Sequence, residues 1–206
     1  MGPGPVRHPG SMNRTDPAPY GPVLAAVVLA GGAARRMGGA DKPGLVVGGR
    51  TLLEGVVAAV RAHRPDTHVV VVGPVRSSPV AEYVREDPPG NGPVPALRAG
   101  LARVHAPRTA LLAADLPHLG AADLAALEEA AAPGPGAVYT DTTGHPQWLT
   151  GLWHTDALRT ALRGYEGASL RGLFGPMEPL RIRPDDDRAV TDCDTPEELD
   201  RARNRW

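Results

Sequence analysis

The stretch Leu29-Ala-Gly-Gly-Ala-Ala-Arg-Arg-Met-Gly-Gly-Ala-Asp-Lys42 directly follows an uninterrupted apolar run that begins at Val23. An apolar run without polar alternation is typical of a strand that is buried on both faces of a parallel sheet. Glycines that directly follow such a strand let backbone N–H groups turn toward an anion, because no side chain stands in the way. The stretch therefore predicts an α/β sheet with an anion-binding loop at the carboxyl end of one strand.

Lys42 is the only lysine of the chain, in which Lys and Arg together number 22. An ammonium group fits beside a single phosphate oxygen, whereas a guanidinium group is a planar fork that needs two acceptors. The composition of the chain, which is rich in Ala, Arg, Gly and Pro, offers a competing explanation for the single lysine. In such a chain lysine is rare at every position, so one lysine can remain by chance. The place of Lys42 after a buried strand and beside Arg35 and Arg36 favours a phosphate ligand. The loop has neither the Walker pattern nor the G-x-G-x-x-G pattern.

Length and composition exclude several classes of protein. A chain of 206 residues is long enough for one well-cored domain. A net charge of −1 and 4% aromatic residues do not fit a nucleic-acid-binding protein. The single cysteine, Cys193, fits a reducing cytoplasm and is expected in the core, because no histidine partner for catalysis lies nearby. Residues 1–22 are rich in Pro and Gly and are expected to be disordered, without a membrane span, and Gly10-Ser11-Met12 is typical of a tag scar.

From Val23 onward, short aliphatic segments alternate with alanine- and leucine-rich amphipathic segments. This alternation predicts one three-layer, Rossmann-like α/β domain over residues 23–206, with a mostly parallel sheet and helices on both faces. Thr51 and Glu54 have the spacing of a capping box. Strands are expected at 23–30, 45–47, 68–73, 83–86, 109–114 and 137–140, and helices from 51, at 97–104, 121–131 and 156–162, and from 195.

Acidic residues follow the predicted strands at the edge where a parallel sheet binds its ligands. Asp115 directly follows the segment 109–114 and is suited to Mg²⁺, which prefers one or two carboxylates together with phosphate oxygens. An aspartate that caps the following helix is an equally good reading. Asp192 and Asp194 flank Cys193 with the alternation of a strand, so both carboxylates would face one side, although Asp194 also fits the cap of the last helix.

Four segments together resemble the molybdenum cofactor guanylyltransferases, which are MobA-like nucleotidyltransferases. They are residues 29–42, Asp87 before Gly92-Pro93, Ala114-Asp115-Leu-Pro117, and Asp194-Thr-Pro-Glu-Glu-Leu199. The resemblance runs from about Val23 to the end of the chain. It implies transfer of GMP from GTP to Mo-molybdopterin with release of pyrophosphate, Mg²⁺ as the cofactor, and transient contacts with other proteins of the cofactor pathway.

The resemblance also implies roles for individual residues. The backbone of Leu29, Ala30, Gly31 and Gly32 would meet the guanosine. Arg36 and Lys42 would bind the phosphates, and Asp87 would help to hold the nucleoside. Asp115 would bind both Mg²⁺ and the nucleotide. Asp194 would join it at the metal, and Asp192 and Asp194 would lie on the acceptor side.

Two other functions remain open from the sequence. The first alternative is a cytidylyltransferase, or a nucleotidyltransferase that acts on a sugar phosphate. Position 31 distinguishes the cytidylyltransferase relatives, which tend to have Ala where this chain has Gly31. A nucleotide-binding module without catalysis is the other, although such a module would be expected to lack Lys42 or Asp115. The segment Val71-Val72-Gly73-Pro74 also has no Asn where some members of the family use one for the nucleotide. His145-Pro146-Gln147 resembles a segment beside the acceptor pocket, without an assigned role.

Overall fold

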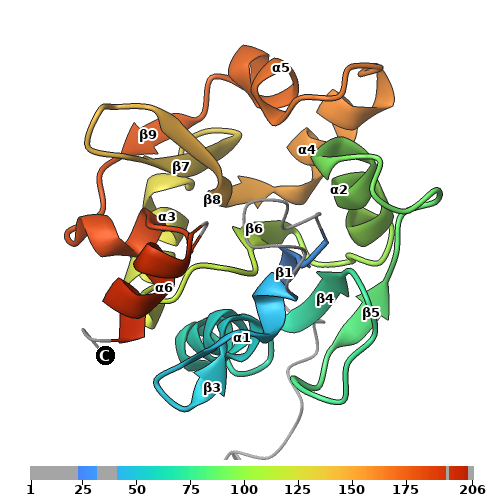
Figure 1. Cartoon of the computed structure of the whole chain (residues 1–206). Coiled ribbons are helices and arrows are strands. Elements are labelled where there is room, and N and C mark those ends of the chain that lie inside the picture. Colours follow the sequence, from blue (N-terminus) through green and yellow to red (C-terminus); the bar gives the residue numbers. More distant parts are fainter. Residues whose placement is uncertain (1–22, 32–40, 194, 204–206) are drawn as a thin grey trace, which may run out of the picture.

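The computed structural model of the chain describes residues 23–31, 41–193 and 195–203 (Figure 1). The segment 1–22 and three predicted site residues, Gly32, Arg36 and Asp194, lie outside the described residues. Within the described ranges, no helix has the length and apolar character needed to cross a lipid bilayer.

A seven-stranded sheet forms the centre of the fold, in the order β5-β4-β1-β6-β8-β7-β9. Every neighbouring pair is parallel except the two pairs made by β8, which runs antiparallel to both β6 and β7. The prediction of a mostly parallel sheet is therefore confirmed. The strands are β1 (Leu24–Leu29), β4 (His68–Val72), β5 (Glu82–Val84), β6 (Arg108–Ala113), β7 (Gly136–Thr140), β8 (Pro146–His154) and β9 (Leu180–Ile182).

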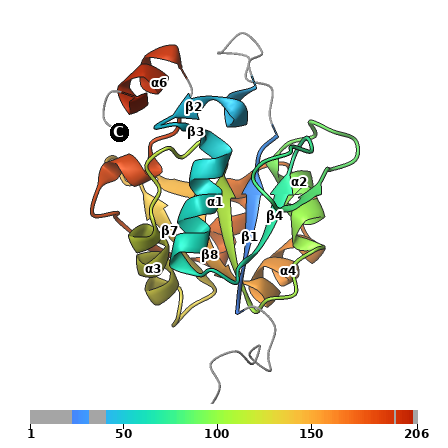
Figure 2. The ribbon, with the colours of Figure 1, turned by 90° about the horizontal axis from the view of Figure 1, so that it is seen from below.

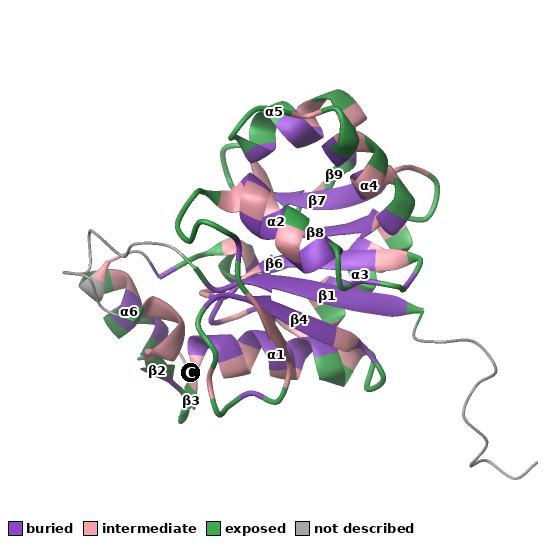
Figure 3. Cartoon of the chain, turned by 90° about the vertical axis from the view of Figure 1, so that its right-hand side faces the viewer, coloured by how far each residue is buried: buried purple, intermediate pink, exposed green. Residues whose placement is uncertain are grey.

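Helices cover both faces of this sheet, as Figures 1 and 2 show. One apolar cluster joins the sheet to α1 (Leu52–His63) and α3 (Ala121–Ala130). A second cluster joins the opposite face to α2 (Pro93–Leu101), α4 (Thr155–Arg163) and α5 (Leu170–Phe174). All six residues of β1 are buried, and the central strands are enclosed on both faces (Figure 3). The three-layer prediction is confirmed.

A small appendix lies beside the amino end of α1. The two-stranded pair β2 (Val46–Val47) and β3 (Arg50–Thr51) packs there with α6 (Pro196–Arg203), as Figure 2 shows. The capping box that begins α1 is present, since Glu54 N–H donates to Thr51 Oγ1 at 3.2 Å and Thr51 N–H donates to Glu54 Oε2 at 2.7 Å. The predicted strand 45–47 thus belongs to this pair and not to the central sheet.

Several boundaries differ from the prediction for physical reasons. The helix expected at 97–104 begins at Pro93, because proline is well tolerated in a first helical turn, and it ends at Leu101. Strand β8 was not predicted, since Pro146, Thr150 and Gly151 interrupt its apolar pattern. Asp192 and Cys193 lie outside regular strands, although Asp192 is exposed and Cys193 is buried, as the alternation predicts.

Candidate active site

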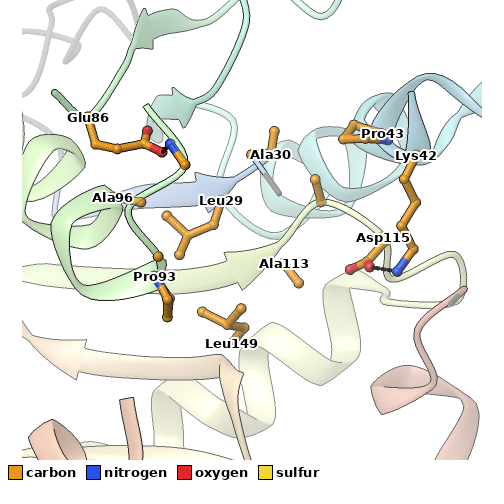
Figure 4. Close-up of a pocket in the computed structure, with 14 residues that line it drawn as sticks. Leu29, Ala30, Lys42, Pro43, Glu86, Pro93, Ala96, Ala113, Asp115 and Leu149 are labelled. Carbon is orange, nitrogen blue, oxygen red and sulfur yellow. Dashed lines mark hydrogen bonds and ion pairs between the residues drawn. The ribbon is translucent and has the colours of Figure 1, made fainter. Parts of the chain in front are cut away.

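The carboxyl ends of β1 and β6 open into a cavity of about 380 Å³ (Figure 4). Because these strands are parallel neighbours, the segments that follow them meet at one edge of the sheet. The cavity is lined by Leu29, Ala30, Gly31, Lys42, Pro43, Glu86, Gly90, Gly92, Pro93, Ala96, Ala113, Ala114, Asp115 and Leu149. Five of the predicted site residues, Leu29, Ala30, Gly31, Lys42 and Asp115, are thus brought together.

Lys42 and Asp115 form an ion pair at one end of this cavity (Figure 4). Lys42 begins the 3-10 helix η2 (Lys42–Gly44), and Asp115 is separated from the end of β6 by Ala114. The Lys42 Nζ donates a hydrogen bond to Asp115 Oδ2, and the two side chains are only 14% and 18% exposed. The alternative role of Asp115 as a helix cap is wrong, because α3 is preceded by Gly120 at its cap position.

The end of β1 supplies the floor of the cavity. Leu29 and Ala30 bond to the neighbouring segments through their backbones: Ala30 N–H donates to Val72 O at 2.9 Å, and Ala114 N–H donates to Leu29 O at 3.1 Å. A Cβ added at Gly31 would meet its nearest atoms, in Val72 and Glu86, at 3.8 and 3.9 Å, which are ordinary contacts. The protein's own packing therefore does not require glycine at position 31, and its absent side chain leaves space on the cavity side.

The acidic residue after β5 that lines the cavity is Glu86 and not Asp87. Glu86 is 8% exposed, and its Oε1 accepts a hydrogen bond from Gly90 N–H at 2.8 Å. Asp87 is exposed and does not line the cavity. Strand alternation is the signal that could have identified Glu86, since it lies two residues after Val84, which packs against the core.

A second cavity of about 270 Å³ adjoins the first and is partly lined by Asp41 and Arg85. Next to it, Arg76 Nη1 donates to Asp41 Oδ2 at 2.6 Å, and Arg76 Nη2 donates to the other oxygen of the same carboxylate. The hydrogen bond from Arg76 lowers the pKa of Asp41 below its usual value, while burial opposes this shift. A Cβ at Gly44 would overlap the Asp41 carboxylate, so this ion pair requires glycine there.

Gly73 explains why the asparagine used by some relatives has no counterpart here. A Cβ at this position would lie 3.0 Å from both the carbonyl carbon and the oxygen of Ala30. Real Cβ atoms rarely approach the backbone so closely, so the end of β4 can lie against the end of β1 only without a side chain.

Cys193 lies in the core, as predicted. It packs with Val47, Leu52, Leu199 and Ala202. Burial, helped by the negative charge of Asp115, raises the pKa of the Cys193 thiol to about 11, against an opposing effect of Lys42. A thiol with this pKa is almost entirely protonated at neutral pH and is a poor nucleophile.

The donors near the cavity fit a shared Mg²⁺ site better than a closed protein cage. Among the described residues, no group of three or more His, Cys, Asp and Glu side chains is placed to hold a metal ion. Asp115 presents one carboxylate at the cavity, and Mg²⁺ is commonly held by one or two carboxylates together with substrate phosphates. Asp192 is exposed and does not line this cavity.

Several known proteins have sequences similar to this chain. A probable molybdenum cofactor guanylyltransferase from Opitutus terrae is 32% identical over 195 residues, which cover 88% of this chain and 96% of that protein. Another from Mycolicibacterium paratuberculosis is 32% identical over 185 residues, covering 85% and 93%.

Solved structures share the fold. A nucleotidyl transferase from Methanothermobacter thermautotroptrophicus has a TM-score of 0.78 at 21% identity and covers 90% of this chain and 98% of that chain. The molybdopterin-guanine dinucleotide biosynthesis protein A from Archaeoglobus fulgidus has a TM-score of 0.64 at 18% identity, covering 87% and 97%. The family model of the MobA-like NTP transferase domain matches residues 26–181. The chain therefore belongs to the MobA-like NTP transferase family and is a nucleotidyltransferase.

Proposed function

We propose that this protein transfers GMP from GTP to the phosphate of Mo-molybdopterin and releases pyrophosphate. The names of the relatives, molybdenum cofactor guanylyltransferases, support this assignment across most of the chain. The structural observation that carries it is the ion pair between Lys42 and Asp115 at one end of the cavity. A cation and a carboxylate at that end suit the triphosphate of a nucleotide, and the rest of the cavity is left for the nucleoside.

In this reaction an oxygen of the acceptor phosphate forms a bond to the α-phosphorus of GTP. The bond from that phosphorus to the bridging oxygen of the β-phosphate breaks, and pyrophosphate leaves with the electron pair. The protein orients the two reactants and neutralises the phosphate oxygens, which is sufficient for large rate accelerations. No nucleophile of the protein takes part, which agrees with the buried, protonated thiol of Cys193.

Lys42 is the residue of this chain that we assign to the phosphate charge. Its ammonium group is partly buried beside Asp115, so its charge is weakly screened by solvent. The interaction of this ammonium with a phosphate oxygen would strengthen as negative charge moves onto the leaving group. The predicted phosphate contact of Arg36 concerns a residue outside the described ranges and remains a prediction.

Asp115 would hold Mg²⁺ in the loaded enzyme, together with phosphate oxygens of the nucleotide. When bound, this ion would supply charge neutralisation at the phosphates. The carboxylate of Asp115 also accepts a hydrogen bond from the Lys42 ammonium. A shared role for Asp194 at the metal, and for Asp192 and Asp194 on the acceptor side, remains a prediction.

The proposal is tested by measuring pyrophosphate release from GTP, CTP and ATP with Mo-molybdopterin and Mg²⁺. We expect GTP to be the best substrate. If CTP is the better substrate, the protein is a cytidylyltransferase and not a guanylyltransferase. No release from any nucleotide, in a protein that still binds nucleotides, would favour a binding module without catalysis.

Lys42→Arg separates the need for an ammonium group from the need for positive charge. We expect this variant to keep the melting temperature and to lose ~10²-fold or more in kcat, because a guanidinium cannot occupy the same space beside one oxygen. Arg188→Lys is the matched control, since Arg188 pairs with Asp186 and lines neither cavity. Near-normal turnover of Lys42→Arg would show that charge alone is required.

A further inference from the structure

The cavity has a second charged end that the mechanism does not use. Figure 4 shows Glu86 at the end opposite to Lys42 and Asp115, with Leu29 and Ala30 between them. The side chain belongs to a residue that is 8% exposed and lines both cavities. A buried carboxylate is costly unless hydrogen bonds or a cation compensate it, so the contacts of Glu86 need an explanation.

The protein itself compensates Glu86 only in part. The one hydrogen bond to its carboxylate within the described residues comes from Gly90 N–H to Oε1, at 2.8 Å. Gly90 has a φ of +82°, which favours glycine, so the loop is built to bring this N–H to the carboxylate. A carboxylate offers about four lone-pair positions. The remaining positions, including those of Oε2, have no hydrogen-bond partner among the described residues.

The open space beside the carboxylate is set by Gly31. A Cβ at Gly31 would lie 3.9 Å from Glu86 Oε1, so the absent side chain leaves the carboxylate uncovered. The cavity therefore presents an ammonium at one end and, at the other, a carboxylate with unused acceptor positions. A nucleoside triphosphate has the complementary order of groups, with anionic phosphates at one end and a base carrying N–H donors at the other.

The number of donors distinguishes the bases. Guanine presents two adjacent donors on one edge, N1–H and the 2-amino group. Adenine and cytosine present a single amino group next to a ring nitrogen that accepts, and this nitrogen would face the carboxylate with an unfavourable interaction. A buried acceptor-only group discriminates strongly against such a mismatch, because its lone pairs stay unpaired.

We propose that Glu86 recognises the guanine base by accepting hydrogen bonds from N1–H and the 2-amino group. This inference rests on the proposed function, and it concerns a residue that the motifs did not single out. Glu86 is a specificity-determining residue in this assignment, while Lys42 and Asp115 act at the phosphates.

The experiment measures the dissociation constants of GTP, ITP and XTP for the full chain by titration calorimetry, without the acceptor. ITP lacks the 2-amino group, and XTP carries a carbonyl oxygen in its place. The wild type should bind GTP ~10- to 100-fold more tightly than ITP, because one hydrogen bond to a charged group is lost. XTP should bind more weakly than ITP, since its oxygen faces the carboxylate.

Glu86→Gln keeps an oxygen for Gly90 N–H and places an amide N–H₂ toward the base. We expect the preference for GTP over ITP to fall to within about threefold, and the ratio of XTP to GTP affinity to rise at least ~10-fold. Glu82→Gln is the matched control, because Glu82 begins β5, shortly before Glu86, pairs with His68 and Arg103, and lines neither cavity. This control should keep the wild-type order of affinities.

An equal weakening of all three nucleotides in Glu86→Gln would overturn the inference, because Glu86 would then serve only to hold Gly90. If Glu86→Gln does not fold, the wild type still decides: XTP or ITP binding as tightly as GTP would overturn it. Loss of pyrophosphate release with every nucleotide would overturn the proposed function while leaving these binding ratios unchanged. The two proposals therefore fail separately.

Discussion

Arg76→Ala should impair turnover far more than it impairs folding. Arg76 binds both oxygens of the Asp41 carboxylate, and Asp41 directly precedes Lys42. The loop that carries Arg76 is itself fastened, since Ser78 Oγ donates to Glu54 and Tyr83 Oη donates to Pro79 O. The loop that follows β4 thus holds the backbone next to Lys42, through the ion pair between Arg76 and Asp41.

The magnitude of each effect follows from exposure and geometry. The Asp41 side chain is 60% exposed, so loss of this ion pair should cost only about 0–1 kcal/mol of the free energy of unfolding. A displacement of about 1 Å in a catalytic group can cost about 10²-fold in rate. We therefore expect kcat to fall ~10- to 100-fold, with a change in melting temperature of at most about 4 °C. Arg76→Lys should restore only part of the rate, because an ammonium cannot bind both oxygens in the same way.

The assay combines steady-state kinetics with chemical labelling of the single lysine. Trace acetylation, followed by mass spectrometry of the peptide that contains Lys42, reports the exposure of its amine without requiring turnover. Labelling should be faster in Arg76→Ala than in the wild type, where the Lys42 side chain is 14% exposed. Arg61→Ala is the control, because Arg61 bonds to Val80 O on the same loop and not to Asp41.

Unchanged kcat and unchanged labelling in Arg76→Ala would refute the reasoning. An equal loss of kcat in Arg61→Ala would also refute it, since the effect would then belong to the loop and not to the Asp41 ion pair.

Two further variants test other features. Gly31→Ala should fold normally, because the added Cβ would lie 3.9 Å from Glu86 Oε1. The ratio of kcat/KM for GTP to kcat/KM for CTP should fall ~10-fold in this variant. An unchanged ratio would show that Gly31 does not contribute to the choice of base. Burial raises the pKa of Glu128, but hydrogen bonds from Arg64 and His63 outweigh it and hold the pKa below its usual value. A depressed acid pKa stabilises the fold above the unfolded pKa, so Glu128→Gln should cost ~1–3 kcal/mol at pH 7, measured by urea denaturation. This difference should shrink below about pH 4, and a constant difference would contradict the assignment.

The elements that the sequence predicts best are those with strong local signals. The apolar run of β1 and the capping box at Thr51 and Glu54 required no knowledge of distant residues. Asp115 and Lys42 were recognisable because each follows a strand or a glycine-rich loop at the ligand-binding edge of the sheet.

Other features depend on contacts that sequence alone does not display. Strand β8 lies between β6 and β7, and its glycine at position 151 is explained by the neighbouring strand, because a Cβ there would overlap the Val138 side chain. Glu86 received no role because the resemblance pointed to its neighbour Asp87. The burial that distinguishes Glu86 from Asp87 depends on tertiary packing, which no local pattern displays. The pairing of Arg76 with Asp41 joins residues 35 positions apart, and no local pattern predicts such a pair.

The position of β8 in the sheet also constrains the order in which the chain can fold. β7 precedes β8 in sequence but has no place on the sheet until β8 has paired with β6, because β8 separates the two. During synthesis, the edge of β6 that pairs with β8 therefore stays unpaired until the chain has been made beyond His154, and β7 can join the sheet only together with β8 or after it. An unpaired edge of this kind is a site for wrong strand pairing, so this interval is when the nascent protein is most exposed to aggregation.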